Sequence, residues 1–560
     1  MIGSGKNARI WGKAAAGFKA AARRSFKRAA AAALAAVMAA AGAFGGTAAA
    51  AERPHYISAT YCSDEWVITF WNSESAHMEE ELKQIAADGF NSIILVVPWR
   101  EFQPSMSPVR YEDYAFDKLD RVMREAERAG LDVLFRVGYT WDYSRADDSD
   151  SCLERFRSLL YDDTARAAWR DYVSTLYKAA SAHNNFAGGF LTWEDFWNFV
   201  ESAGSYGKGK NSRDWAKKIG YSDYVMEHYT IDEVNELYGE DFRSGDDIYL
   251  PEAKSHGFKL FYEFYDDFLN EILAESQQVF PNLSMEVRLD VDPVYPEDGE
   301  AVGCSHQSTF SCGSSSFTSA MYSVAMGQEQ GRVIGADEGV RTMDAILGLT
   351  QFFNGGKPIY VDQFLFMDNT PGFESNARLN PQEIPAFIAG SADVLRRRSK
   401  GYGIWTYRDY CDSVVYNAQF GLGESGWMFE GQASVQERDG NRRACLPARS
   451  AVSQNLHVNL SPKSDEPVRV RFLAGGDEGS QIVVSLDGKK KTIQVGGEGK
   501  VYEAEFGSGS YGSLRFESIG NAWVDDVKAY AFVTKSEIYG IDGAPGAALE
   551  ALRGLNAAMR

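Results

Sequence analysis

The chain has few of the residues that build metal centres and nucleotide sites. Its 7 histidines are scattered, none of its 6 cysteines belongs to a CxxC pair, and no HExxH motif occurs. There is no Gly-rich phosphate loop, and no GxSxG elbow with a histidine beside it. These absences predict a protein with no metal and no nucleotide cofactor, and they leave esterase chemistry without support.

Positive charge is also scarce, because 57 lysines and arginines stand against 78 aspartates and glutamates, a formal net charge of −21. Such a surface repels nucleic acid and anionic membranes at low salt, so neither is expected as a partner. It tolerates neutral glycans and would attract cationic ones, although solubility outside the cell is the simpler explanation. We expect a monomer.

The basic residues gather at the N-terminus. Residues 1–51 hold eight of them and no acidic residue, and they continue into an Ala-rich run, Ala29 to Gly46, and a stretch of small residues. This pattern predicts a secretory signal cleaved near Ala50 or Ala51. The Arg23-Arg24 pair resembles a twin-arginine signal, and an unusually basic Sec signal is the alternative. No other apolar stretch is long enough to span a bilayer, so we expect a secreted protein.

Export to an oxidising compartment favours disulfides. Cys304 and Cys312 bracket a small Ser-rich loop and are the pair that we expect first.

Between residues 56 and 407, β-branched and aromatic runs alternate with amphipathic helices, which predicts an α/β fold, a (β/α)8 TIM barrel over residues 52–412. The helix Phe116–Ala129, for example, has Leu119, Val122 and Ala126 on one face. No clear helix separates strands 5 and 6. A long insertion, about 196–250, follows strand 4. The eight strands are expected at 56–61, 92–99, 132–139, 186–194, 284–291, 318–326, 358–366 and 401–407.

After Asp412 the pattern changes to short alternating runs with turns such as Asp487-Gly488. This change predicts an all-β sandwich domain over residues 413–535. Residues 536–560 are expected to form a tail, loosely packed from Gly540 onwards.

Two of the barrel strands end in carboxylates, and the C-terminal ends of barrel strands are where active sites lie. Glu194 ends strand 4 and is flanked by Trp193 and Phe196, surroundings that raise the pKa of a carboxyl group and suit a general acid. Asp362 ends strand 7. A retaining glycosidase needs such a pair, one as acid/base and one as nucleophile. A rim carboxylate held in an ion pair is the alternative for each residue taken alone.

Aromatic and polar residues crowd the same strand ends. Sugar rings present C–H faces that stack on aromatic side chains, so these residues are candidates for substrate binding, with core packing as the alternative. Arg136 could hold the nucleophile ionised or bond a sugar hydroxyl. The candidate substrate-binding residues are Trp99, Arg136, Tyr139, Trp193, Tyr322, Gln363 and Trp405.

Over residues 56–410 the sequence resembles glycoside hydrolase clan A, particularly the family 5 cellulase-like enzymes. Leu191-Thr192-Trp193-Glu194 matches the end of strand 4 in that group, and the match implies that Glu194 is the acid/base. Ile404-Trp405-Thr406-Tyr407 is similar to their strand 8, which implies that Trp405 lines the −1 subsite. The resemblance implies hydrolysis of a β-linked polysaccharide by double displacement.

Two residues depart from that family pattern. Trp193 stands where the family usually has Asn, and Gln363 fills the slot of the strand 7 nucleophile, with Asp362 one residue early. A slip of one residue reverses the side on which a strand residue faces unless a bulge corrects it. Three interpretations stay open. Asp362 is the nucleophile through a local bulge; another acid, such as Glu286, Asp290 or Glu338, takes that role; or the barrel binds glycan without cleaving it.

The C-terminal region resembles a jelly-roll carbohydrate-binding module. Gly426-Trp427-Met428-Phe429 is similar to the opening strand of such modules, and Ala522-Trp523-Val524-Asp525-Asp526-Val527 to the closing one. Because these motifs are mostly structural, they predict the fold better than they predict glycan affinity, and Trp427 is expected in the core. Asp525 and Asp526 could hold Ca²⁺, but an acidic turn pair is the commoner case.

Overall fold

The computed structural model describes residues 55–75, 77–139, 152–192, 210–252, 255–287, 312–326, 328–367, 375–438, 440–456, 458 and 465–560. The expected signal segment, Trp193, Glu194, Asp290 and Cys304 lie outside these residues. Within them, no helix combines the length and apolar character needed to cross a bilayer.

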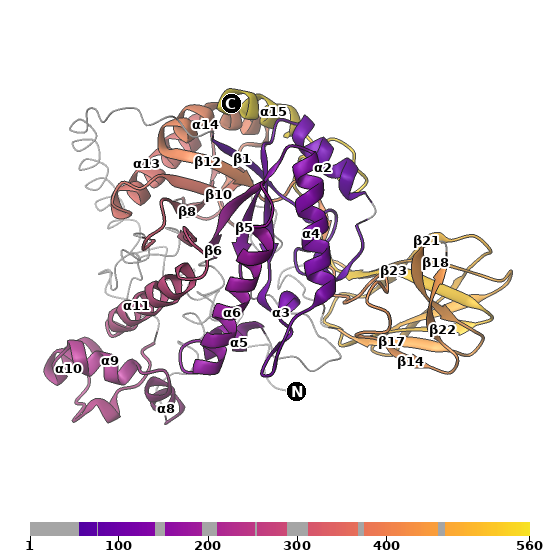
Figure 1. Ribbon diagram of the computed structural model, residues 1–560, viewed down its shortest axis with the longest axis horizontal. Helices are drawn as coiled ribbons and strands as arrows, with labels where there is room; N and C mark the ends of the chain where they lie inside the picture. Colours follow the sequence, from indigo (N-terminus) through magenta and orange to yellow (C-terminus); the bar gives the residue numbers. More distant parts are fainter. Residues whose placement is uncertain are drawn as a thin grey trace.

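Eight parallel strands close into a barrel in which each strand pairs with its neighbour along the chain, and the last pairs with the first. This architecture confirms the expected TIM barrel followed by antiparallel sheets (Figure 1). The strands are β1 (Tyr56–Thr60), β2 (Ser92–Val97), β5 (Asp132–Val137), β6 (Phe186–Leu191), β7 (Ser284–Val287), β8 (Thr318–Ser323), β10 (Ile359–Leu365) and β12 (Ser399–Ile404).

Apolar side chains fill the inside of the barrel, so its interior is a packed core and not a pore. They are Ile94, Leu134, Phe190, Phe317 and Tyr360, each at most 2% exposed. The Tyr360 hydroxyl donates to Ser58 Oγ at 2.7 Å, which satisfies the one polar atom of this group.

Amphipathic helices surround the barrel and cover it with their apolar faces. In α4, as expected, Leu119, Val122 and Ala126 are buried on one face. The helix ends at Arg128, and Gly130, whose φ of +73° suits glycine, follows the C-cap residue Ala129. The covering helices are α2 (Met78–Ala87), α4 (Asp113–Arg128), α6 (Asp163–Ala180), α11 (Phe258–Gln277), α13 (Ala336–Phe353) and α14 (Ile384–Arg398).

The long insertion after strand 4 contains α8 (Lys210–Lys218), α9 (Tyr221–His228) and α10 (Ile231–Tyr238), and α9 packs against α11 (Figure 1). The sequence had suggested only a Gly- and Ser-rich insertion there. Shorter elements decorate the barrel: η1 (Thr69–Asn72), α3 (Trp99–Phe102), β3 (Ser105–Met106), β4 (Val109–Arg110), α5 (Cys152–Ser158), η3 (Gly245–Asp247), β9 (Val333–Ile334), β11 (Arg378–Leu379) and η4 (Pro381–Glu383).

Two five-stranded antiparallel sheets form the sandwich beside the barrel (Figure 1). The first contains, in spatial order, β14 (Met428–Glu430), β17 (Ala451–Asn455), β22 (Ser513–Ile519), β19 (Gln481–Leu486) and β20 (Lys489–Gln494). The second contains β15 (Ser434–Arg438), β16 (Asn441–Leu446), β23 (Ala522–Tyr530), β18 (Val468–Gly476) and β21 (Lys500–Phe506). A two-stranded ribbon, β13 (Tyr410–Cys411) with β24 (Val533–Thr534), joins the two ends of the sandwich to the barrel.

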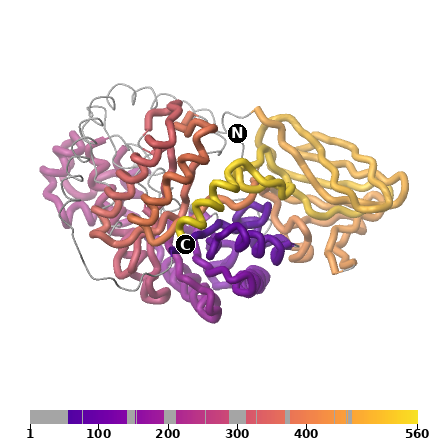
Figure 2. The backbone as a smooth tube through the Cα atoms, turned by 90° about the horizontal axis from the view of Figure 1, so that it is seen from above, coloured from indigo at the N-terminus to yellow at the C-terminus, as the bar shows by residue number. Residues whose placement is uncertain are grey.

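The expectation of a loosely packed tail is wrong for residues 549–559, which form α15 (Leu549–Met559). This helix packs against α14, and its Asn556 accepts a hydrogen bond from Tyr402 of β12. It also contacts the end of α2, where Arg553 Nη2 lies 2.6 Å from the Asp88 carboxylate. In Figures 1 and 2 the chain returns from the sandwich to lie on the barrel. The tail thus supplies the helix that follows the eighth strand.

A buried ion cluster joins the sandwich to the barrel. Lys528 of β23 lies 2.9 Å from both Asp64 and Glu65, which follow β1, and its side chain is 2% exposed. A second contact lies nearby, where Asn72 Oδ1 accepts from the backbone of Asn417 at 2.9 Å. Because both contacts are buried, the two domains are held in one orientation.

Candidate functional site

Arg136 is the centre of the polar cluster at the barrel mouth. It is the penultimate residue of β5 and is 2% exposed. Its Nη2 donates to Thr192 Oγ1 at 2.9 Å and lies 3.3 Å from the Glu286 carboxylate. In the amide orientation that satisfies both groups, the Gln363 oxygen accepts from Nη1 at 2.6 Å and from Nη2 at 3.1 Å. Four strand ends therefore meet on one guanidinium.

Two aromatic rings flank the same guanidinium. Its carbon lies 5.6 Å from the ring centre of Trp405 and 5.9 Å from that of Tyr139, within the range of cation–π attraction. Trp405 directly follows β12 and is half-buried, and the peptide bond after it is cis. Of the candidate substrate-binding residues, Arg136, Tyr139, Gln363 and Trp405 are brought together.

A β-bulge in β10 determines on which side of the strand the side chains of Asp362 and Gln363 lie. Val361 pairs with Ala320 of β8 and Gln363 with Met321, so Asp362 is the extra residue. Strict alternation from the inward-facing Tyr360 would turn Gln363 outward. Because of the bulge, Gln363 instead reaches Arg136 at the mouth.

The next residue shows that the facing of β10 has changed. Strict alternation would turn Phe364 into the barrel, but its ring stacks on Phe387 of α14 outside it. Asp362 itself is 1% exposed. Burial raises the pKa of the Tyr360 hydroxyl above its usual value, and the nearby Asp362 carboxylate adds to the rise. Asp362 therefore lies next to the inner barrel core, just below the mouth.

Two of the candidate substrate-binding residues lie in the hydrophobic core instead. Trp99 is fully buried, packs edge-on against Trp169 of α6 and donates from Nε1 to Gln103 at 2.8 Å. Tyr322 is also fully buried, and its hydroxyl donates to the backbone of Gly339 on α13. Both rings face the surrounding helices, so neither leaves a face open at the mouth.

The alternative acids differ in position. Glu286 is fully buried and ion-paired with Arg136, so it belongs to the mouth cluster. Glu338 lies on α13 and forms its ion pair with Arg332 at 2.7 Å, away from Arg136. Thr192 is the residue of the cluster that the sequence analysis did not select. Its position directly before Trp193-Glu194 was the available signal.

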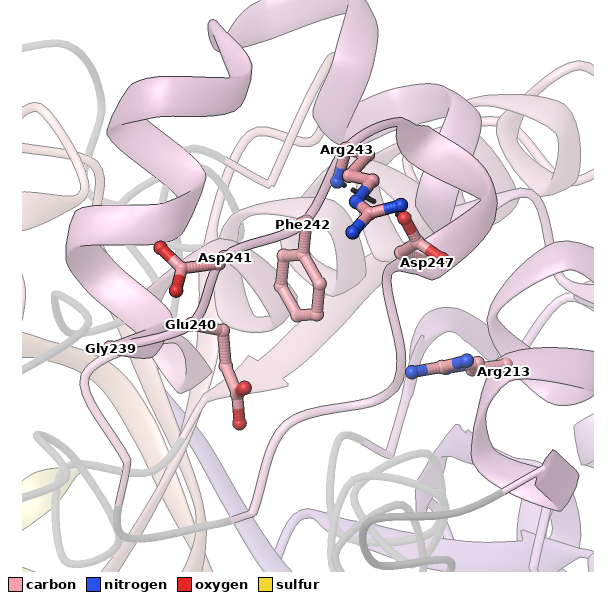
Figure 3. Close-up of a pocket in the computed structure, with 7 residues that line it drawn as sticks. All are labelled: Arg213, Gly239, Glu240, Asp241, Phe242, Arg243 and Asp247. Carbon is pink, nitrogen blue, oxygen red and sulfur yellow. Dashed lines mark hydrogen bonds between the residues drawn. The ribbon is translucent and has the colours of Figure 1, made fainter.

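A hollow lies on the insertion. It has a volume of about 370 Å³ and is lined by Arg213, Gly239, Glu240, Asp241, Phe242, Arg243 and Asp247 (Figure 3). Its charges are partly matched: Asp247 accepts from the backbone of Arg243 at 3.0 Å, and Glu240 accepts from the Tyr249 hydroxyl at 3.0 Å. None of the candidate site residues in the described part of the chain lines it. In the described part of the chain, no group of three or more His, Cys, Asp or Glu side chains could hold a metal ion.

No protein-family model matches the sequence, and no curated protein matches it either. Solved structures with a similar barrel include a GH5_18 protein from Streptomyces cattleya in complex with GlcNAc (16% identity, 64% of this chain and 72% of that one, TM-score 0.39). A β-galactosidase from Marinomonas ef1 (12%, 63% and 54%, TM-score 0.44) and the exo-β-1,4-mannosidase Op5Man5 from an Opitutaceae bacterium (11%, 64% and 53%, TM-score 0.39) are also similar. At these identities and TM-scores the similarity does not extend to activity.

Proposed function

We propose that this protein is a secreted glycoside hydrolase that cleaves the O-glycosidic bonds of a β-linked polysaccharide with retention of configuration. The observation that carries the proposal is the position of the Asp362 carboxylate, which lies beside the inward-facing Tyr360 and directly before Gln363 of the mouth cluster, where it can serve as the strand 7 nucleophile. The polar and aromatic mouth around Arg136 supports a sugar ligand, because it offers hydrogen-bond donors beside rings for C–H stacking.

In the proposed reaction, the carboxyl group of Glu194 protonates the leaving oxygen while the Asp362 carboxylate attacks the anomeric carbon. The C–O bond to the leaving sugar breaks, and a glycosyl ester forms on Asp362. Glu194, now a carboxylate, takes a proton from water, which attacks the anomeric carbon and releases Asp362. Arg136 holds Gln363 and Glu286 at the mouth, where their polar atoms contact the sugar.

A reducing-end assay over β-glucans, β-mannans, xylans and amino-sugar polymers tests this mechanism. Glu194→Gln and Asp362→Asn are each expected to lower the rate by about three orders of magnitude or more, because each removes a group that acts on the reacting bond. Glu338→Gln, a change in a carboxylate that is paired on α13, is the matched control and keeps full activity. If Glu286→Gln loses activity while Asp362→Asn keeps it, then Glu286 of β7 is the nucleophile and not Asp362.

A glycan-binding protein with an inactive barrel is the second candidate, and the amide of Gln363 on Arg136 favours it. At the position where the family 5 enzymes have their nucleophile, this chain has the amide of Gln363, which cannot attack the anomeric carbon. Under this alternative the wild type releases no reducing ends, still retains polymer, and gains turnover when Gln363→Glu restores a carboxylate. Turnover by the wild type excludes it.

Secretion rests on the basic and Ala-rich segment at residues 1–51. Expression of the full chain in a bacterial host, followed by N-terminal sequencing of the exported product, tests this part. We expect a new N-terminus near Ala51 or Glu52, and an uncleaved chain retained in the cytoplasm would contradict it.

A further inference from the structure

The hollow on the insertion is formed by three short segments (Figure 3). Arg213 comes from α8, residues 239–243 form the loop that follows α10, and Asp247 belongs to η3. The loop starts at Gly239, the C-cap of α10, whose φ of +65° is a left-handed conformation that glycine adopts without strain. None of these segments belongs to a barrel strand, so the hollow is separate from the barrel mouth.

Hydrogen bonds from side chains hold this loop in its shape. The Asn235 amide donates to the backbone oxygen of Phe242 at 3.0 Å, and its Oδ1 accepts from the Phe242 backbone N–H at 2.7 Å. The Asp247 carboxylate accepts from the backbone N–H of Arg243 at 3.0 Å. Phe242 is thus bound twice by α10, and Arg243 once by η3. The wall that the loop gives to the hollow is therefore fixed without a ligand.

A buried serine holds α8 against the segment that follows η3. Ser212 is fully buried, its hydroxyl donates to the backbone oxygen of Leu250 at 3.1 Å, and its backbone oxygen accepts from the Leu250 N–H. Lys217 of the same helix lies 2.8 Å from Asp246 of η3. Arg213 directly follows Ser212, so its backbone is fixed beside the hollow. A site that is already formed loses little conformational entropy when a ligand binds.

The Phe242 ring gives the hollow an apolar wall. Phe242 is 8% exposed, and its ring packs edge-on against those of Tyr238 at 5.3 Å and Tyr249 at 5.5 Å. The Tyr238 hydroxyl donates to the backbone oxygen of Tyr249 at 2.9 Å, so the three rings form a fixed cluster. An apolar part of a ligand can contact the part of the Phe242 ring that lines the hollow.

Two arginine side chains line the hollow without a carboxylate partner. Arg213 and Arg243 are both exposed, and within the described residues neither guanidinium forms an ion pair. Figure 3 shows the Asp241 carboxylate turned away from both of them. A guanidinium presents parallel N–H donors that match the two oxygens of a carboxylate. The arginines therefore favour a ligand that carries a carboxylate.

The acidic residues of the same hollow disfavour a simple anion. The lining contains three of them, Glu240, Asp241 and Asp247, against the two arginines, and the whole chain has a net charge of −21. The half-buried Glu240 carboxylate accepts from the Tyr249 hydroxyl at 3.0 Å, and in Figure 3 it lies on the other side of the hollow from Arg213. A ligand with negative charge alone is repelled there, whereas a positive group on the same ligand is attracted.

We propose that this hollow binds a small zwitterion of the amino-acid type, a free amino acid or a dipeptide with an apolar side chain. Its carboxylate is held by Arg213 and Arg243, its ammonium group faces Glu240, and its apolar side chain lies against Phe242. The volume of about 370 Å³ is within the range of small-molecule sites. The proposal goes beyond the proposed function and does not depend on it, because the hollow has no residue in common with the cluster around Arg136.

Isothermal titration calorimetry with the purified protein tests the site. The probes are leucine, phenylalanine and the dipeptide leucyl-phenylalanine. Each is paired with its amide, which lacks the carboxylate, and with its N-acetyl derivative, which lacks the ammonium group, and inorganic phosphate serves as a simple anion. We expect at least one zwitterion to bind, and its amide and its N-acetyl derivative each to bind more weakly by about tenfold, because each loses a charge-assisted contact.

Variants assign the two ends of the ligand. Arg213→Ala and Arg243→Ala are each expected to weaken binding of the zwitterion by about tenfold, because each removes a charged donor. Glu240→Gln keeps an acceptor for the Tyr249 hydroxyl but removes the negative charge, so it should weaken the zwitterion and not the N-acetyl derivative. A purely structural role of Glu240 would not give this selectivity. Arg438→Ala, in the exposed part of β15, is the matched control and leaves binding unchanged.

Three outcomes overturn the proposal: no zwitterion binds the parent, binding is unchanged in both Arg213→Ala and Arg243→Ala, or phosphate and the N-acetyl derivatives bind as tightly as the zwitterions. The last outcome would make the hollow a site for simple anions. The melting temperature of each variant without ligand confirms that its fold is kept. The probes contain no sugar and binding is measured without turnover, so these outcomes leave the hydrolase proposal standing, and an inactive barrel leaves this proposal standing.

Discussion

Lys528→Met probes the ion cluster that joins the two domains. The change removes the ammonium between Asp64 and Glu65, while methionine keeps most of the side-chain volume. Lys528 is 2% exposed and Glu65 4%, whereas Asp64 is 30% exposed, so it is the Glu65 carboxylate that would be left buried without a counter-charge. Removing one partner of such a cluster costs about 3–5 kcal/mol in the free energy of unfolding.

The pH dependence follows from the pKa values of the two carboxyl groups. Burial acts to raise the pKa of Asp64, but Lys528 outweighs it and the pKa is lowered; burial raises the pKa of Glu65 despite Lys528. In the wild type, the contribution of Asp64 is present above its unfolded pKa and is lost as the pH falls through the lower folded value. Without Lys528 both folded pKa values rise, so the folded variant takes up protons as the pH falls. The difference in the free energy of unfolding between the wild type and Lys528→Met is therefore largest near pH 8 and becomes smaller toward pH 5.

Guanidinium denaturation followed by tryptophan fluorescence at pH 8 and pH 5 measures both effects. Lys490→Met on the exposed edge strand β20 is the matched control and is expected to stay within about 0.5 kcal/mol of the wild type. Adding Asp64→Asn and Glu65→Gln to Lys528→Met should recover much of the loss, because no buried charge then remains uncompensated. Equal midpoints for Lys528→Met and Lys490→Met, or a deficit that grows toward pH 5, would refute this reasoning.

Three further predictions concern the barrel. Arg136→Met leaves Glu286 and Gln363 without their shared donor, so it should lower both the melting temperature and glycan turnover. Arg136→Lys should not restore turnover, because lysine lacks the planar, forked donor group of arginine. Full activity in either variant contradicts the role given to Arg136 at the barrel mouth. Burial lowers the pKa of Lys118 to about 7 in the folded protein, whereas the pKa in the unfolded chain is near about 10.4. Between these values only the unfolded chain binds the proton, so from pH 7 to pH 10 the wild type should gain stability relative to Lys118→Met, by at most about 1.4 kcal/mol per pH unit. Denaturation at pH 7 and pH 9.5 measures this trend, and a stability that falls over this range rejects the prediction. Arg553→Met removes a charged partner from Asp88, which is 1% exposed, and should cost about 1.5–3 kcal/mol against a small effect of Arg397→Met on the exposed side of α14.

Much of the barrel could be predicted from local patterns. The strand expected at residues 92–99 is observed as Ser92–Val97, and the helix expected at 116–129 as Asp113–Arg128. Helix α13 begins at Ala336, but its first turn contains the polar pair Asp337-Glu338 and shows no apolar periodicity that would mark this start. Periodicity reports which face of an element is apolar, so it finds the body of an element better than its ends.

The site depended on information that no single strand carries. The bulge at Asp362 is a mismatch between β10 and β8, and it decides the facing of Gln363 and Phe364. Trp99 was selected as an aromatic residue at a strand end, but it begins α3 and turns toward α6. The helical signal of Leu549, Leu552 and Leu555 was present in the sequence. This helix packs against α14, from which the whole sandwich domain separates it in the sequence, and a local pattern of apolar residues does not identify so distant a partner.

The return of α15 to the barrel has a consequence for how the chain folds. The contact between Asp88 and Arg553 joins residues 465 positions apart. Closing so long a loop has an entropic cost that grows only slowly with length, but contacts of this range form late and slow the search for the native topology. During synthesis the ring of helices stays open until the whole sandwich has been made. The sandwich, though it follows the eighth strand, is therefore an insertion within the barrel's last unit. A shortened version of this protein must join the chain near residue 412 to the segment before α15, because a simple truncation there would remove a wall of the barrel.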